Sequence, residues 1–312
     1  MGTKVLITID TECDNMWSAQ ACRNPAFANI ENLPRLQALF DRFKAKPTYL
    51  VTYSVANSGQ ISVLKDIAKS SSCEIGTHLH AMETPPFVSQ RQGDGSFLHQ
   101  YDVEAQAEKL ANIDRLLTDV FAKKPVSYRG GRWSINHDLL VLLSKKGYFV
   151  DSSVTPGISW QRIGGLNFKK NTNKDHFSSE GVLEVPASMV ITSRLRPLAV
   201  PLYMNLPDFT HIEGILRRLS GFDIIWLDPS FNDFEKMKLA CQSLIEEGAD
   251  FLNIIFHSSV IIAGGTPFTM TQEKVDLFFQ RLEQILDFLI NQKGLSSITV
   301  RQYYDYRKAN FN

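Results

Sequence analysis

Two histidines, His78 and His80, are separated by a single residue in the segment EIGTHLH, where an expected strand ends. Two imidazoles on one side of a strand end can act together as ligands of a divalent metal ion. A lone histidine is more often structural, but a His-x-His pair beside a strand end, with carboxylates at the same end of the fold, favours metal binding. Glu83, in the loop that follows, is interpreted as structural.

Two carboxylates, Asp10 and Glu12, end the first apolar run of the chain in the segment TIDTE. In an extended segment, residues two apart point to the same side, so both carboxylates can face one cavity. The alternative is that Asp10 caps a turn and Glu12 is solvated. This motif alone does not decide between the two.

An arginine that can hold one of these acids lies in the segment SYRGGRW. Arg129 ends an expected strand and keeps its charge, so it can hold and tune a nearby carboxylate. Gly130 and Gly131 allow a sharp turn and a close backbone approach. Asp151 ends the next expected strand and can orient a histidine. The alternatives are that Arg129 is an arginine in a surface loop and that Asp151 is an aspartate in a turn.

A further histidine, His257, follows a continuously apolar run in the segment NIIFHSS. A titratable side chain at the mouth of a barrel can act as a general acid.

The elements that position these residues alternate as strand and helix along the chain. Several of the expected strands are continuously apolar, which is typical of strands covered on both faces. We expect strands at 4–10, 48–53, 73–77, 126–129, 148–151, 182–185, 223–227, 251–256 and 297–300. Helices are expected after Asn32 and Asn136 and over 102–122, 232–247 and 271–292. About seven repeats of strand and helix predict a closed α/β barrel that forms a single domain over residues 1–312.

Two segments interrupt this alternation, at 81–101 and 155–181, and both are rich in Gly, Pro, Ser and Asn. Loops this long in a compact domain are usually functional or disordered. Both follow the carboxyl end of a strand, the face where such barrels build their sites. We expect them to shape access of the substrate.

The charge balance and the cysteines limit the possible partners and location. Lys plus Arg equals Asp plus Glu at 33 each, so no electrostatic attraction to nucleic acid is expected. No segment reaches the ~18 consecutive apolar residues of a membrane span. The four cysteines form no C-x-x-C pair, and no leader peptide is recognised at the start. A cytoplasmic location is expected.

Taken in order, TIDTE, EIGTHLH, SYRGGRW, DSSV and FHSS resemble the five motifs of the polysaccharide deacetylase superfamily, also called the NodB homology or carbohydrate esterase 4 family. The resemblance spans roughly residues 4–268. The sequence looks most like a bacterial branch of this superfamily that is associated with surface polysaccharides. It implies a distorted (β/α)7 barrel of the TIM type. It also implies a metal-dependent hydrolase that removes an N-acyl group, such as acetyl, from a sugar of a polysaccharide or its precursor.

The resemblance further implies a divalent metal ion, zinc, bound by Glu12, His78 and His80. The second motif of the superfamily usually carries two histidines four residues apart. Here the fourth residue after His78 is Met82, so His80 takes the place of the second histidine.

The remaining motifs imply the catalytic groups. Asp10 corresponds to the base and Arg129 to the arginine that pairs with it. His257 corresponds to the general acid, and Asp151 to the acid that orients it.

Substrate contacts are expected from the turns beside these groups. Trp133 is the favoured aromatic residue for stacking on a sugar ring, and backbone N–H groups of Gly130 and Gly131 are candidates for stabilising an oxyanion. Ser258, next to the general acid, is a further candidate. Three alternatives share the motifs: another C–N hydrolase acting on a small amide or ureide, an O-acetyl esterase, and a non-catalytic carbohydrate-binding relative.

Overall fold

The computed structural model describes residues 2–18, 23–87, 92–207 and 212–310. Cys22 and residues 88–91 of the loop expected at 81–101 lie outside the described residues.

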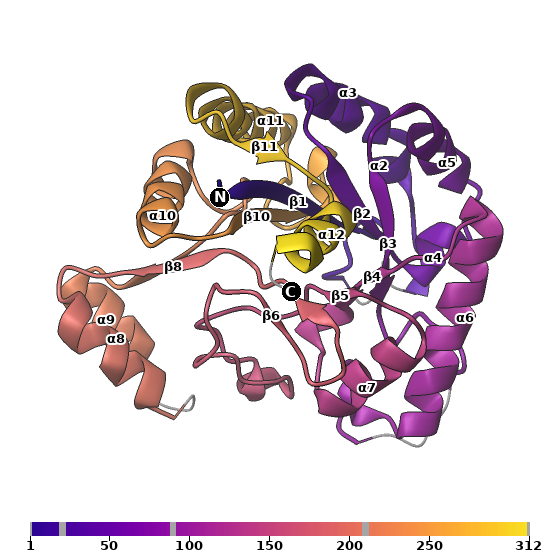
Figure 1. Cartoon of the computed structure of the whole chain (residues 1–312), viewed down its shortest axis with the longest axis horizontal. Helices are drawn as coiled ribbons and strands as arrows, with labels where there is room; N and C mark the ends of the chain where they lie inside the picture. Colours follow the sequence, from indigo (N-terminus) through magenta and orange to yellow (C-terminus); the bar gives the residue numbers. More distant parts are fainter. Residues whose placement is uncertain (1, 19–22, 88–91, 208–211, 311–312) are drawn as a thin grey trace.

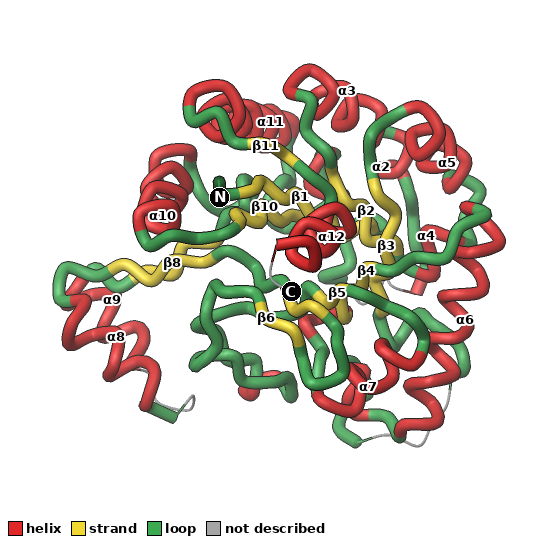
Figure 2. The backbone as a smooth tube through the Cα atoms, viewed as in Figure 1, coloured by secondary structure: helices red, strands yellow, loops and turns green. Residues whose placement is uncertain are grey.

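A curved parallel sheet forms the centre of the molecule (Figures 1 and 2). Its strands are buried on both faces, as their continuous apolar runs predict. In spatial order they are β10 (Phe251–His257), β1 (Lys4–Thr11), β2 (Pro47–Val51), β3 (Glu74–Leu79), β4 (Ser127–Gly130), β5 (Val150–Asp151) and β7 (Leu183–Glu184). The edge strand β6 (His176–Phe177) runs antiparallel to β7, and β11 (Ser296–Ser297) pairs with the start of β1.

Between β7 and β10 the regular ladder is replaced by a separate antiparallel ribbon of β8 (Met189–Thr192) and β9 (Asp223–Trp226). Leu227 N donates to Ser188 O at 3.2 Å where the two ribbon strands meet the barrel. Ile255 N donates to Leu227 O at 3.0 Å and Asn253 N donates to Ser188 Oγ at 2.9 Å, which connects the ribbon to β10. The structure therefore confirms the predicted fold, a distorted barrel.

Helices pack around the outside of the sheet (Figure 1). They are α2 (Ala28–Glu31), α3 (Leu33–Phe43), α4 (Tyr53–Ala56), α5 (Ile61–Ser70), α6 (Val103–Phe121), α7 (His137–Lys145), α10 (Phe234–Glu246) and α11 (Gln272–Leu286), the last continued by a π-helical turn over Asp287–Gln292. The side chain of Asn136 caps α7 by accepting from Leu139 N, as predicted. Asn32 precedes α3 but makes no such bond; its amide instead donates to Ala28 O at 2.8 Å.

The carboxyl-terminal segment differs from the prediction. A strand was expected at 297–300, but Val300 begins helix α12 (Val300–Asn310). Val300, Tyr303 and Tyr304 pack against Leu6 and Phe251, near the amino-terminal ends of β1 and β10. α12 therefore covers the end of the barrel where these strands begin.

Besides α12, the helices α2, α4, α5, α8 and α9 were not predicted. α8 (Arg196–Asn205) and α9 (Ile212–Ser220) follow β8 and project from one side of the barrel (Figure 1). No helix within the described ranges has the length and apolarity needed to cross a bilayer.

Candidate active site

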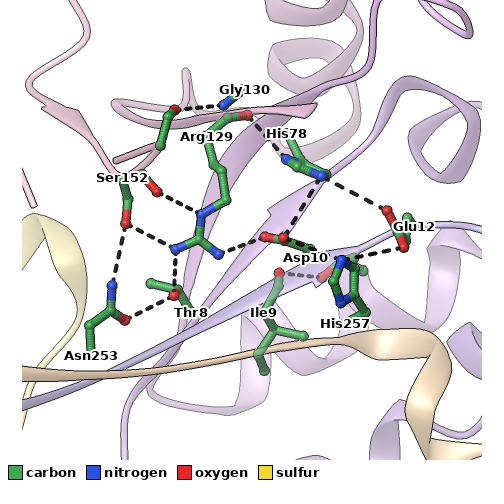
Figure 3. Close-up of polar contacts among 12 residues, drawn as sticks. Thr8, Ile9, Asp10, Glu12, His78, Arg129, Gly130, Ser152, Asn253 and His257 are labelled. Atoms are coloured by element: carbon green, nitrogen blue, oxygen red, sulfur yellow. Dashed lines mark hydrogen bonds and ion pairs between the residues drawn. The ribbon is translucent and has the colours of Figure 1, made fainter. Parts of the chain in front are cut away.

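The predicted site residues meet at the carboxyl ends of neighbouring strands. In the strand register, Asp10 of β1 lies beside His257 of β10, and His78 of β3 lies beside Arg129 of β4. Because parallel strands end on the same rim of a barrel, motifs far apart in the sequence come together there. Figure 3 shows these side chains converging on one space.

Arg129 is the centre of this arrangement and is fully buried. Its Nη1 donates to Asp10 Oδ1 at 2.7 Å, and its Nη2 donates to the hydroxyls of Thr8 at 2.7 Å and Ser152 at 2.9 Å. Its Nε donates to Ser152 O at 2.8 Å. These bonds hold the planar guanidinium in one orientation, which a lysine could not reproduce.

Asp10 is buried but ionised. Burial alone would raise the pKa of its carboxyl, but the charge of Arg129, with His78 and His257, outweighs burial and holds the pKa at about 2. While Oδ1 accepts from Arg129, Oδ2 lies 4.0 Å from His78 Nε2 and 3.8 Å from His257 Nε2. One oxygen of Asp10 is thus anchored and the other faces the two histidines.

Glu12, His78 and His80 bring their ligand atoms within 4.8 Å of one another. His80 Nε2 lies 3.4 Å from Glu12 Oε2 and 3.0 Å from His78 Nε2, and His78 Nε2 lies 3.9 Å from Glu12 Oε2. Ligand atoms that each bind zinc at about 2.0–2.2 Å cannot lie more than about 4.4 Å apart. All three separations satisfy this limit.

The electrostatics of these three residues also fit a bound cation. Burial lowers the pKa of His78 to about 3 and lowers that of His80, so both rings are neutral, the form that binds metal. Burial, with the charge of Asp10, raises the pKa of Glu12 to about 8 although His257 opposes it. Glu12 Oε1 is buried without a hydrogen-bond partner. A cation would supply the compensation that this carboxylate lacks.

Neighbouring groups orient these candidate ligands. His78 Nδ1 lies 3.1 Å from Arg129 O, which turns Nε2 toward the site. A Cβ atom on Gly131 would lie 2.7 Å from His80 Cγ and 2.8 Å from Leu79 O, so only glycine fits beside this ring. Glu12 N donates to the hydroxyl of Ser258 at 3.2 Å.

Three of the residues predicted to contact the substrate have partners within the protein. Ser258 is fully buried and bonded to the backbone of Glu12. Gly130 N donates to Ser153 Oγ at 2.8 Å, so its N–H is not free for an oxyanion. The ring of Trp133 is half-buried, 5.1 Å from the Arg129 guanidinium and 5.7 Å from the ring of Trp226.

Asp151 accepts its hydrogen bonds from Ser153. Its Oδ1 accepts from Ser153 Oγ at 2.5 Å and its Oδ2 from Ser153 N at 3.0 Å. Burial, with the charge of Glu184, raises its pKa to about 7. Among the described residues, no hydrogen bond or ion pair joins Asp151 to His257, and the His257 ring packs against Trp17, with centroids 4.8 Å apart. The orientation of His257 by Asp151 is therefore not supported.

A further buried acid, Asp228, was not among the residues predicted from sequence. Asp228 follows β9, the strand that precedes β10 along the chain. Burial, with a smaller contribution from the charge of Asp10, raises its pKa to about 7, and its Oδ1 accepts from the backbone and hydroxyl of Ser230. The signal was present, because an acid after an apolar run (IIWLD) repeats the pattern that identified Asp10.

No protein-family model matches the sequence, and no curated protein sequence matches it. Solved structures do match the fold. A protein from Mycobacterium smegmatis described as a polysaccharide deacetylase has a TM-score of 0.59 at 16% identity, covering 99% of this chain and 92% of that one. The Puue allantoinase has a TM-score of 0.54 at 14% identity, covering 99% and 91%. The chain therefore has the distorted-barrel fold that is found in polysaccharide deacetylases.

Proposed function

We propose that this protein is a zinc-dependent deacetylase of the polysaccharide deacetylase superfamily, which hydrolyses an N-acyl group on a sugar of a polysaccharide or its precursor. The observation that carries the proposal is the meeting of two functional units on one barrel rim. One unit is the buried Asp10–Arg129 pair, and the other is the Glu12, His78 and His80 cluster. His257 lies beside both.

Glu12, His78 and His80 would hold the zinc ion, which when bound polarises a carbonyl and acidifies water. Asp10, ionised and anchored by Arg129, is placed to accept a proton from the attacking water through Oδ2. His257, whose side chain is 24% exposed at the edge of the site, is placed to protonate the leaving amine. These are the two proton transfers that amide hydrolysis requires.

The activity is tested by measuring acyl release from N-acetylated sugars and sugar nucleotides with zinc-loaded protein. His257→Ala should reduce turnover by about 10²- to 10⁴-fold, the usual contribution of a general acid, while the zinc content stays that of the wild type. His137→Ala is the matched control, because that histidine is 71% exposed on α7. Loss of zinc from His257→Ala would contradict the assigned role.

The allantoinase fold match favours a second candidate, hydrolysis of a small amide or ureide by the same groups. Small cyclic amides therefore belong in the same screen. Turnover of these compounds, with none of any acylated sugar, would replace the deacetylase proposal. Zinc and sugar binding without turnover of any compound would support a non-catalytic protein. A cytoplasmic location, and hence a precursor as substrate, stays a prediction.

A further inference from the structure

A chain of aromatic rings runs outward from the candidate general acid. The Trp17 ring contacts the His257 ring edge-on, with centroids 4.8 Å apart. The Phe268 ring lies 5.5 Å from Trp17, and the Phe231 ring lies 4.3 Å from Phe268. We call Trp17, Phe268 and Phe231 the aromatic row.

The two ends of the aromatic row are exposed to solvent. Trp17 is 41% and Phe231 49% exposed, and Phe268 is half-buried between them. Met270, 61% exposed, follows Phe268 closely in the same loop. Exposed apolar side chains that are contiguous with a site mark ligand-binding surfaces more often than isolated ones do.

The aromatic row comes from three loops that follow β1, β9 and β10, the same rim that carries the candidate catalytic groups. Each loop is tied down by hydrogen bonds. Asn15 N donates to Gly265 O at 2.7 Å, which joins the Trp17 turn to the Phe268 loop. Phe268 N donates to Thr266 Oγ1 at 3.2 Å, and the amide of Asn232 donates to Trp226 O at 3.0 Å beside Phe231. The rings are thus held in place before any ligand binds, which lowers the entropic cost of binding.

The geometry points to a saccharide subsite: we propose that the aromatic row binds the apolar C–H face of a pyranose ring linked to the acylated sugar. This inference rests on the proposed function and specifies its substrate as an oligosaccharide or a longer glycan. A pyranose presents C–H groups on one face and hydroxyls at its edge, so flat apolar rings bind the face while water solvates the edge. Trp133, the residue favoured from sequence, packs on Trp226 and Arg129 instead.

The test compares N-acetylglucosamine with its β-linked dimer and trimer, using zinc-loaded full-length protein. For the wild type we expect KM to fall about 3- to 10-fold from monomer to trimer, the range that one aromatic contact contributes. Phe231→Ala should remove most of this fall, because Phe231 lies three ring contacts from His257 and acts on the extended substrate. Trp17→Ala should also remove the fall in KM with saccharide length, and Trp17→Phe should restore part of that fall.

Phe177→Ala is the matched control. Phe177 is 40% exposed, close to the 41% of Trp17, but it packs against Tyr304 of α12 at the other end of the barrel. The Phe177→Ala variant should keep the wild-type dependence of KM on saccharide length. Equal length dependence in Phe231→Ala and Phe177→Ala would overturn the subsite while leaving the deacetylase proposal intact.

A direct titration of each saccharide by calorimetry separates the two proposals. If no saccharide is deacetylated, the proposed function fails, and the titration alone then decides the subsite. Trimer binding that weakens in Phe231→Ala but not in Phe177→Ala supports it. Trimer binding that is absent from the wild type, or equal in both variants, overturns it. Affinity that rises with the alkyl chain of alkyl glycosides, and not with sugar number, would assign the row to a lipid and overturn the pyranose assignment.

Discussion

Arg129 and Asp10 form a buried ion pair across the barrel, with Nη1 2.7 Å from Oδ1 and side chains 0% and 5% exposed. Each side chain compensates the buried charge of the other, which would be costly to bury alone. The pair joins β4 to β1, so it contributes both to the stability of the barrel and to the ionisation of the candidate base.

Arg129→Ala should lower the free energy of unfolding by about 3–5 kcal/mol at pH 7, because it leaves the Asp10 carboxylate buried and unpaired. Urea denaturation measures this. The folded-state pKa of Asp10 is lowered from 3.8 to about 2, so stability from ionised Asp10 is present above pH 3.8 and is lost as the pH falls toward 2. The difference between wild type and variant should therefore shrink over that window.

Arg42→Ala is the control for this change, because Arg42 forms an exposed ion pair with Glu283. The side chains of Arg42 and Glu283 are 60% and 48% exposed. An exposed pair contributes about 0–1 kcal/mol. Similar losses in both variants would show that the buried pair contributes no special stability.

Gly131→Ala should weaken zinc binding by roughly 10- to 100-fold, the usual cost of disturbing a group that orients a ligand. The added methyl group would meet the His80 ring at 2.7 Å and the backbone oxygen of Leu79 at 2.8 Å, so the ring must move. Competition with a chromogenic chelator gives the affinity. Gly59→Ala is the control, because nothing lies within 4 Å of a Cβ atom there. Wild-type affinity in Gly131→Ala would mean that His80 is not a ligand.

Zinc binding should release about one proton below pH 8. Burial raises the pKa of Glu12 to about 8, so the metal-free carboxyl is protonated at neutral pH, whereas His78 is already neutral. Apparent affinity should rise about tenfold per pH unit from pH 6 to 8 and then level off. Calorimetry in buffers of different ionisation enthalpy counts the proton. The Glu12→Gln variant should bind zinc more weakly and release no proton. If the wild type releases no proton on binding zinc, the pKa of Glu12 is not raised.

Asp228→Asn should stabilise the protein at pH 8 relative to wild type, and by less at pH 4. The pKa of Asp228 is raised from 3.8 to about 7, so the folded state binds its proton more tightly than the unfolded state. Wild-type stability therefore falls between pH 4 and 7, at most by about 1.4 kcal/mol per pH unit from this group. Asparagine keeps the acceptor oxygen for both Ser230 bonds.

The stability difference is measured by denaturation at the two pH values. Asp276→Asn, on an aspartate that is 58% exposed, should show no such dependence on pH. If Asp228→Asn changes the free energy of unfolding equally at both pH values, the folded-state pKa of Asp228 is not raised.

The sequence predicted most of the strands and the main site residues because both leave local patterns. An apolar run followed by an acid or a histidine marked the ends of β1, β3 and β10, and the curved parallel sheet brought these ends together. α12 was missed because its tyrosines and charged residues give little helical contrast and its first residues are those of a strand.

The contacts between distant segments were not predictable in the same way. Nothing local indicates that Ser258 holds the backbone of Glu12 or that Gly131 lies against His80. For Asp151, the sequence identified a strand end but not the direction of its partner. Ser153, two residues away, donates to both carboxylate oxygens.

The pairing of β1 with β10 makes Asp10 and His257 neighbours although they come from opposite ends of the chain. During synthesis, a nascent chain that has emerged as far as β4 carries Asp10, Arg129 and the candidate metal ligands but lacks His257, the candidate proton donor. Bringing β10 to β1 closes a very long loop, a slow step for a growing or refolding chain. Recovery of turnover after dilution from denaturant therefore reports the arrival of β10, whereas metal uptake can report an earlier stage.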